Sequence, residues 1–264
     1  MRFAFHLGLI LGLAIATPAF ATGEQAPLKD VEFSFEGPFG TFNRADLQHG
    51  FQVYKEVCSA CHSLNRVAFH TLSQSGGPEF SDAEMKALAG GYKVLAGPND
   101  KGDTLDDHNN PLTRPGTPAD FFPPPFANEE AARAANGGAL PPDLSVIVKA
   151  RVGGPRYVYS LITGFGQKPP PGFVVTTGKY YNPYFLGWNI SMPQPLTDNQ
   201  VTFVDGHPAK IADEAYAVVT FLSWAAEPHL EDRHRIGFGV MIFLIVLSGL
   251  LYLSYRAVWK DTPH

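Results

Sequence analysis

The pentapeptide Cys58-Ser59-Ala60-Cys61-His62 decides how this chain folds. Two cysteines three positions apart, followed at once by a histidine, form the C-x-x-C-H pattern of covalent attachment to a c-type haem. Each thiol can add to one haem vinyl group, and the adjacent imidazole can then bind the iron as its proximal ligand. The motif predicts one haem c, attached through Cys58 and Cys61, with His62 as an iron ligand.

Two other interpretations of the cysteine pair are weaker. A C-x-x-C pair can be a dithiol redox centre, but no βαβ pattern of the kind that hosts such a centre surrounds it. A zinc site would need further ligands in a second cluster, and the sequence contains only these two cysteines. The spacing and the adjacent histidine therefore favour haem.

The sixth iron ligand would decide between electron transfer and chemistry at an open site, and methionine suits an electron carrier. Met85 falls on the apolar stripe of a predicted helix, which favours a core role. Met192 is favoured as the ligand, because Pro193 and Pro195 stiffen the chain around it. Six histidines could compete as ligands. Four stand alone in polar or turn contexts and are expected at the surface: His49, His70, His108 and His207. The other two, His229 and His234, lie close to the apolar C-terminal run.

Both ends of the chain carry membrane-related signals, although a buried helix is the alternative at each end. Residues 1–21 combine a basic start, a short apolar core and a small-residue cleavage pattern, which predicts a secretory signal peptide. Residues 236–255 contain no charged side chain and reach roughly 30 Å as a helix, enough to cross a bilayer. Two basic residues follow, so the tail 256–264 should stay in the cytoplasm and the domain 22–235 should lie outside.

The charge of the outer part constrains its partners. The chain has a formal net charge of −5, and setting aside Arg2 with the signal and Arg256, Lys260 and Asp261 with the tail leaves −7. An acidic domain can steer a basic partner and argues against nucleic acid. A merely soluble acidic surface explains the charge equally well.

The rest of the chain reads as short helices separated by long irregular segments. Apolar periodicity and capping residues predict helices over 45–57, 81–89, 129–135, 157–163 and 208–226. The segments 93–125 and 164–196 are rich in Gly and Pro and are expected to be loops, the second with many aromatic residues. Strand signals are few and short, at Val174-Val175 and Val201 to Val204.

Four blocks outside the motif point to one family. They are Gly50 to Val57 (GFQVYKEV), Asn136 to Ser145 (NGGALPPDLS), Tyr181 to Phe185 (YNPYF) and Trp224 to Pro228 (WAAEP). With these blocks and the C-terminal anchor, the chain resembles cytochrome c1, the haem subunit of the quinol–cytochrome c oxidoreductase (bc1) complex, of the bacterial type. The resemblance implies a mainly α fold, like a class I cytochrome c with long irregular insertions, plus one transmembrane helix.

The resemblance also implies roles for particular residues. His62 and Met192 would be the axial ligands, and Arg151 would lie beside a haem propionate, which a guanidinium can pair in two-pronged fashion. Residues Asn136, Pro142 and Tyr157 would line the haem. The alternatives are a surface charge for Arg151, turn residues for Asn136 and Pro142, and a core aromatic for Tyr157.

By the same resemblance the chain would take an electron from a Rieske iron–sulfur protein and pass it to a soluble or tethered cytochrome c. Cytochrome b and membrane lipid would be its membrane partners, and the chain would perform no bond chemistry itself. It would serve a respiratory or photosynthetic chain at the bacterial inner membrane, with the haem on the periplasmic side. A periplasmic haem sensor, a peroxidase-like enzyme with an exchangeable sixth ligand, and an anchor whose haem is only a folding staple are the rivals.

One feature departs from some bacterial relatives, which carry an extra disulfide near the sixth-ligand loop. Here no cysteine is left to form it. The aromatic residues of the segment 164–196 and the run Pro169-Pro170-Pro171 are the candidates for holding Met192 in place.

Overall fold

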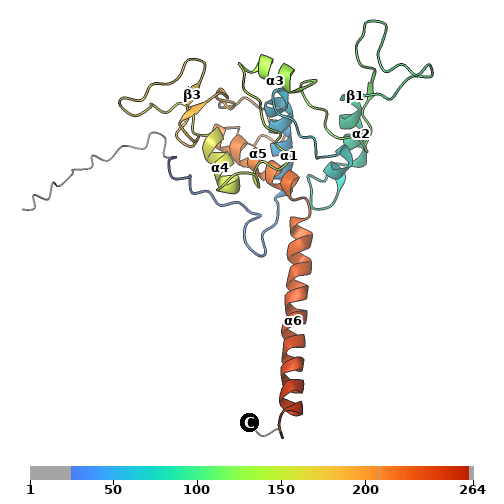
Figure 1. Ribbon diagram of the computed structural model, residues 1–264, viewed down its shortest axis with the longest axis vertical. Coiled ribbons are helices and arrows are strands. Elements are labelled where there is room, and N and C mark those ends of the chain that lie inside the picture. Colours follow the sequence, from blue (N-terminus) through green and yellow to red (C-terminus); the bar gives the residue numbers. More distant parts are fainter. Residues whose placement is uncertain (1–24, 208, 262–264) are drawn as a thin grey trace, which may run out of the picture.

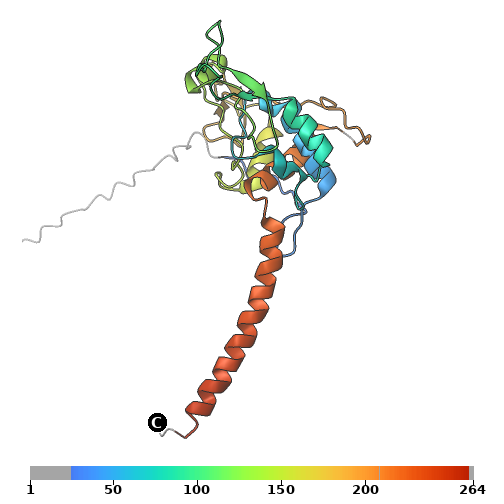
Figure 2. The same ribbon diagram turned by 90° about the vertical axis from the view of Figure 1, so that its right-hand side faces the viewer.

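The computed structural model describes residues 25–207 and 209–261 of the chain. These residues form a body of helices and extended loops, from which the long helix α6 (Leu230–Val258) projects (Figures 1 and 2). The predicted signal segment 1–21 lies outside the described residues.

The body is mainly helical, as predicted, and its strands form two small antiparallel pairs within the described residues. Ahead of α6, the α-helices and strands are α1 (Arg44–Glu56), α2 (Asp82–Gly90), β1 (Lys93–Leu95), β2 (Thr113–Pro115), α3 (Glu129–Ala135), α4 (Gly154–Ile162), β3 (Tyr180–Tyr181), β4 (Asn189–Ile190) and α5 (Ile211–Ala226). Two short 3₁₀ turns lie at Cys58–Ala60 and Phe69–Ser73.

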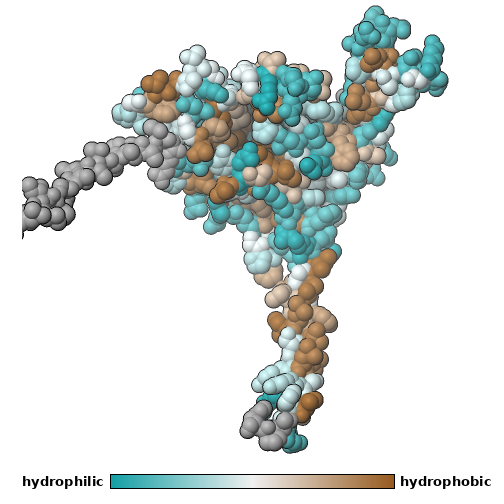
Figure 3. Space-filling view, viewed as in Figure 1, coloured by the Kyte–Doolittle hydropathy of each residue, from teal (hydrophilic) through white to brown (hydrophobic). Residues whose placement is uncertain are grey.

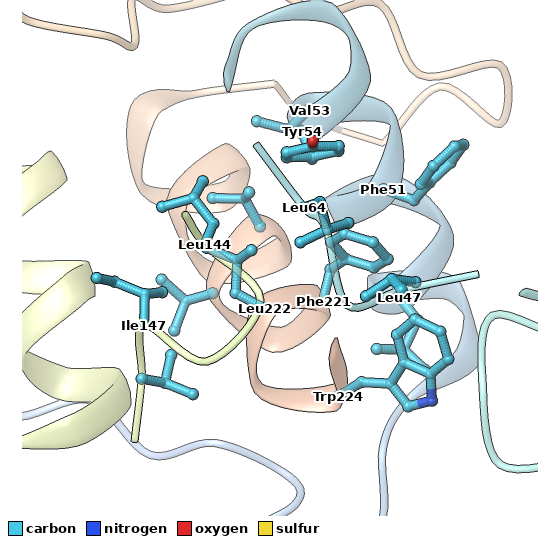
Figure 4. Close-up of a cluster of buried hydrophobic side chains, with 14 of the residues drawn as sticks. Leu47, Phe51, Val53, Tyr54, Leu64, Leu144, Ile147, Phe221, Leu222 and Trp224 are labelled. Atoms are coloured by element: carbon cyan, nitrogen blue, oxygen red, sulfur yellow. The ribbon is translucent and has the colours of Figure 1, made fainter. Parts of the chain in front are cut away.

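Helices α1 and α5 pack along each other at the centre of the body (Figure 1). A side-chain carbon at Gly50 would lie 2.0 Å from the backbone oxygen of Ala217, so only glycine allows so close an approach. Around this contact the rings of Phe51 and Tyr54 pack on Phe221, with centroids 5.6 and 5.9 Å apart (Figure 4). The apolar face predicted for α1 is thus the core face, and the motif follows directly from its end.

Local sequence signals explain where several helices begin. The Asn43 side chain accepts a hydrogen bond from the backbone of Ala45 at 2.9 Å and caps α1. Ser81 and Glu84 form the predicted capping box of α2: each side chain accepts a hydrogen bond from the other residue's backbone N–H. Met85, on that helix, is 4% exposed and belongs to the core, as predicted.

Two helix starts differ from the prediction, α4 for a local reason and α5 because its first N–H bonds a side chain 13 positions away. Helix α4 begins at Gly154 rather than at residue 157, since Pro155 is tolerated in a first turn and Gly153, at φ 88°, turns the chain into it. Helix α5 begins at Ile211, whose N–H donates to the Asp198 carboxylate at 2.9 Å. Pro208, the predicted start, lies outside the described residues.

The predicted strands at Val174-Val175 and at 201–204 are wrong. Val174 is 81% exposed in a loop, and the N–H of Val201 donates to the Glu214 carboxylate instead of to a strand. The observed strands lie in segments that were expected to be loops: β1 pairs with β2, and β3 pairs with β4. Strands this short are defined by their partner rather than by their own alternation.

Helix α6 contains the predicted span 236–255. It is the one helix in the described part of the chain that is long and apolar enough to cross a membrane, and none of its most apolar window is buried against the body. Figure 3 shows it as a mainly brown column below a surface in which teal residues dominate. A helix this apolar and this unprotected is typical of a membrane anchor.

Candidate haem site

The two cysteines and the histidine of the motif share one short turn at the end of α1. The backbone N–H groups of Cys61 and His62 both donate to the Cys58 carbonyl, at 3.1 and 2.9 Å. Cys58 is half-buried against the core and Cys61 is exposed, and both thiols are free. Burial raises the pKa of Cys58 to about 12, so this thiol is protonated at neutral pH. The turn places two sulfurs and an imidazole within a few residues of each other.

The His62 ring is oriented by a residue 80 positions away. Its Nδ1 lies 2.8 Å from the carbonyl oxygen of Pro142. Because a carbonyl can only accept, Nδ1 carries the proton and Nε2 keeps its lone pair. Burial lowers the pKa of His62, which favours the neutral ring. A metal-binding histidine needs this arrangement, with one nitrogen fixed by an outer partner and the other available for the metal.

A set of hydrogen bonds clamps the segment after His62 to the segment after Pro142. The Asp143 carboxylate accepts hydrogen bonds from Ser63 Oγ at 2.8 Å and from the Asn65 N–H at 2.9 Å. The N–H of Leu144 donates to the Ser63 carbonyl at 2.9 Å. From the other side, the Tyr54 hydroxyl donates to the His62 carbonyl at 3.3 Å. These bonds fix the position of the Pro142 carbonyl that orients the imidazole.

A cavity of about 320 Å³ opens beside the motif, between residues 124–129 and α3. Cys61 and Pro142 line it together with Ala132 of α3. Asn136 ends α3 and donates from Nδ2 to the Ala132 carbonyl at 2.8 Å. Pro142 is therefore placed next to the motif, and Asn136 supports the wall of the same cavity.

Arg151 and Tyr157 form a second group. Arg151 is exposed, and its Nη1 donates to the carbonyl of its neighbour Ala150 at 3.0 Å. No carboxylate within the described residues pairs with Arg151, so its guanidinium remains available to an anionic group. Tyr157 is buried in the first turn of α4; burial raises its pKa, and the nearby charge of Arg151 opposes that rise.

Met192 follows the β3–β4 hairpin by two residues and is half-buried. Among the described residues, no hydrogen bond or ion pair links it to the His62 group. The hairpin is fixed to α4 through Asn182, which is fully buried and donates from Nδ2 to the Leu161 carbonyl at 2.8 Å. The Asn182 N–H also donates to the Trp188 carbonyl at 3.0 Å, across the hairpin. Met192 is thus held by a segment with a firm attachment of its own.

Three aromatic rings pack together in the same region. The Phe173 ring lies 5.8 Å from the ring of Tyr181 and 5.2 Å from that of Trp188, and the last two are 6.1 Å apart. Offset and edge-to-face pairs at these distances are favourable. The aromatic residues proposed from the sequence therefore form a cluster across the hairpin that precedes Met192.

Asp143 and Asn182 position the site although no role was predicted for either, and the expectation that His49 lies at the surface is wrong. His49 is 9% exposed, its Nε2 lies 2.9 Å from Asp205 Oδ2, and its ring stacks on His207 with centroids 4.9 Å apart. The loop before α5 covers it, which no local pattern indicates. The Pro-Pro-Asp-Leu-Ser stretch was a usable signal for Asp143, because Asp often bonds the backbone two residues on.

A helical body with a C-x-x-C-H turn and one exposed apolar helix defines a membrane-anchored protein of the c-type haem class. Comparisons with known proteins agree: the sequence model of the Cytochrome C1 family matches residues 33–262. Cytochrome c1 of Rhodospirillum rubrum is 44% identical over 267 residues, covering 96% of this chain and 94% of that protein. The mitochondrial cytochrome c1 haem protein of Saccharomyces cerevisiae is 46% identical over 241 residues, covering 91% and 73%.

A third relative is longer. The "Cytochrome b/c1" of Bradyrhizobium diazoefficiens is 49% identical over 249 residues, which are 88% of this chain but 35% of that protein. This chain therefore spans about a third of that protein's length. The chain belongs to the cytochrome c1 family, which provides the electron-transfer subunit of the bc1 complex. Family members carry one covalently bound haem c, which confirms the predicted cofactor.

Proposed function

We propose that this chain relays single electrons from a Rieske iron–sulfur protein to a soluble or tethered cytochrome c within a bc1 complex. The observation that carries the proposal is the hydrogen bond between His62 Nδ1 and the Pro142 carbonyl, at 2.8 Å. It leaves Nε2 as the available nitrogen beside the two cysteines of the attachment motif. A relay needs a ligand held in this way, because the iron should change valence without changing its neighbours.

The chain's residues would divide the work as follows. Cys58 and Cys61 would hold the haem through thioether bonds, and His62 Nε2 and the Met192 sulfur would be the two axial ligands. The haem, when bound, supplies an iron that changes its charge by one electron. Arg151 would pair with a propionate, because it has no carboxylate partner within the described residues. The remaining lining residues would be Asn136, Pro142 and Tyr157.

The proposed partners follow from the anchor and from the charge. Cytochrome b is the proposed membrane partner, and the name of the Bradyrhizobium relative, "Cytochrome b/c1", supports it. An outer part with a net charge of −7 would favour a basic cytochrome c. The chain itself would carry no catalytic site for bond chemistry, so quinol oxidation would take place elsewhere in the complex.

We also propose a topology. Residues 1–21 would be removed as a signal peptide, 22–235 would form the periplasmic haem domain, 236–255 would cross the bacterial inner membrane, and 256–264 would remain in the cytoplasm. Arg256 and Lys260 directly after the span support this orientation through the positive-inside rule.

Spectra and a redox titration of the purified full-length protein in detergent test the proposal. We expect a low-spin, six-coordinate iron in both oxidation states and no rapid binding of carbon monoxide by the reduced form at neutral pH. Purified membranes should also show quinol-dependent reduction of cytochrome c. A high-spin ferric form with fast carbon monoxide binding would instead support the sensor or peroxidase-like alternative.

A further inference from the structure

A closed loop, Phe33–Phe42, hangs below the body beside the first turns of α6, and both views show it there (Figures 1 and 2). Its two arms are joined by the hydrogen bond from Thr41 N–H to the Ser34 carbonyl, at 3.1 Å. Gly37 has a φ of 79°, and a side-chain carbon at Gly40 would lie 2.3 Å from the Glu36 carbonyl oxygen. The tip is therefore a tight turn that requires glycine at two positions.

Two residues of α6 fasten this loop to the helix. The Glu231 carboxylate accepts the Phe42 N–H at 2.8 Å and two Arg44 nitrogens at 2.8 and 2.7 Å. One turn further along, His234 Nδ1 donates to the Gly40 carbonyl at 3.1 Å. The loop and the start of α6 thus form one unit, and the tip is held at a fixed level along the helix.

The tip presents one aromatic side chain outward. Phe33, Phe35 and Phe42 of this loop are 4–6% exposed and belong to the core, whereas Phe39 is 75% exposed. The Phe39 ring packs edge-to-face on Phe238 of α6, with centroids 5.8 Å apart. A shallow, mainly apolar groove of about 250 Å³ lies between the loop and the helix at this point.

The position of Phe39 along α6 relates it to the predicted membrane span. Phe238 is the third residue of the uncharged run 236–255, so Phe39 lies where that run begins. The neighbouring helix residues Phe238, Met241 and Ile242 are 50–58% exposed and would face lipid. Residues 37–42 of the loop carry no charge, while Arg235 lies just above the run, at the level expected for lipid headgroups. The exposed ring therefore continues the exposed apolar surface of the helix.

We propose that the tip of this loop, with Phe39 at its apex, inserts into the outer boundary between lipid headgroups and acyl chains. An aromatic ring at this depth buries apolar surface without placing backbone in the hydrocarbon. This second contact with the bilayer, together with the Glu231 and His234 bonds, would fix the tilt of the haem-binding body relative to the membrane. The inference rests on the proposed membrane span.

The test measures the depth of a nitroxide label on the full-length, haem-loaded protein in phospholipid nanodiscs. Because Cys58 and Cys61 are consumed by thioether bonds, Phe39→Cys gives a single labelling site. Ile245→Cys marks the middle of the span, and Val204→Cys marks a fully exposed residue of the body. Collisions with oxygen report lipid, and collisions with a water-soluble nickel chelate report water.

We expect the oxygen-to-nickel collision ratio at position 39 to be at least severalfold above that at position 204 and below that at position 245. A ratio at 39 equal to that at 204, with 245 in lipid, overturns the inference but leaves the span intact. A label at position 245 that collides mainly with the nickel chelate overturns both the inference and the membrane span. Protection of position 39 from both reagents in native membranes would show a protein partner there and also overturn it.

A second variant covers the case in which Phe39→Cys fails to bind haem. With Phe39→Trp, brominated lipids should quench extra tryptophan fluorescence relative to the unmodified protein. An unquenched signal would contradict insertion as clearly as the label result.

Discussion

The Asp143 carboxylate accepts a hydrogen bond from the N–H of Asn65 at 2.9 Å, across 78 positions of sequence. With the bond from Ser63 Oγ, it joins the segment that carries His62 to the segment that carries Pro142. This carboxylate therefore helps to place the carbonyl that orients the imidazole, together with the Leu144 N–H bond to the Ser63 carbonyl. Asp143 acts on the site by bonding the chain after His62, so its effect is one of positioning.

Removing this carboxylate should loosen the site. We expect Asp143→Ala to lower the free energy of unfolding by about 2 kcal/mol, because three donors, from Ser63, Asn65 and Ser145, lose a charged acceptor. Urea unfolding of the haem-loaded protein, followed by far-ultraviolet circular dichroism, measures the change. Asp100→Ala, in the exposed loop between β1 and β2, is the control and should change stability by less than about 0.5 kcal/mol. Equal effects of the two variants would refute the positioning role.

Asp143 should also shape the response to acid. Burial opposes its ionisation, but the hydrogen bonds from Asn65, Ser145 and Ser63 outweigh burial and hold its pKa below the ordinary value. A carboxylate with a lowered folded pKa contributes stability above its unfolded pKa of about 4, and this contribution is lost as pH falls through the folded pKa. Asp143→Asn should therefore be less stable than the unmodified protein mainly above pH 4. Its free energy of unfolding should also fall less steeply as the pH is lowered. The free energy of unfolding, measured from pH 6 to pH 3, gives this slope for both proteins. Equal slopes would contradict a lowered pKa of Asp143.

Replacing the proposed sulfur ligand should distinguish a haem that transfers electrons from one that only stabilises the fold. We expect Met192→Leu to lower the haem reduction potential and to block quinol-dependent cytochrome c reduction, because a thioether ligand favours the ferrous state. Met85→Leu makes the same chemical change in the core, where such a swap costs less than about 1.5 kcal/mol, and should leave the potential unchanged. A Met192→Leu protein that still reduces cytochrome c normally would support the alternative in which the haem only stabilises the fold.

Asn182 should control how firmly Met192 is held. Its amide is fully buried, donates to the Leu161 carbonyl and accepts the Tyr184 N–H at 3.0 Å, so Asn182→Ala removes both bonds, leaves that N–H unpaired and should cost about 1–3 kcal/mol. We also expect part of the reduced protein to bind carbon monoxide, as the sulfur is released. Tyr180→Ala, an exposed change in the same hairpin, should show neither effect. Loss of stability without carbon monoxide binding would show that the hairpin does not hold the Met192 sulfur in place.

The acidic outer part predicts a salt-sensitive encounter. If a net charge of −7 steers a basic cytochrome c, the association rate should fall by about tenfold or more between low salt and physiological ionic strength. Stopped-flow mixing of the reduced protein with oxidised cytochrome c measures it. An association rate that does not respond to salt would argue against electrostatic steering.

Local patterns predicted much of the fold. The capping box placed α2 within one residue, and the apolar period of α1 identified its core face. The uncharged run near the C-terminus predicted the exposed part of α6. These features depend on neighbours three or four positions apart, which a sequence displays directly. The strands failed for the opposite reason: β3 and β4 exist only because the chain pairs them.

For the candidate site, the sequence by itself determined the chemistry of attachment, because two thiols and an imidazole on one turn are a matter of spacing. Only the tertiary structure decided which nitrogen of His62 is available, since the Pro142 carbonyl comes from 80 residues away. It also decided that His49 is covered and that Phe39 is not. These exposures and the partner of His62 depend on segments distant in sequence, which no local pattern encodes.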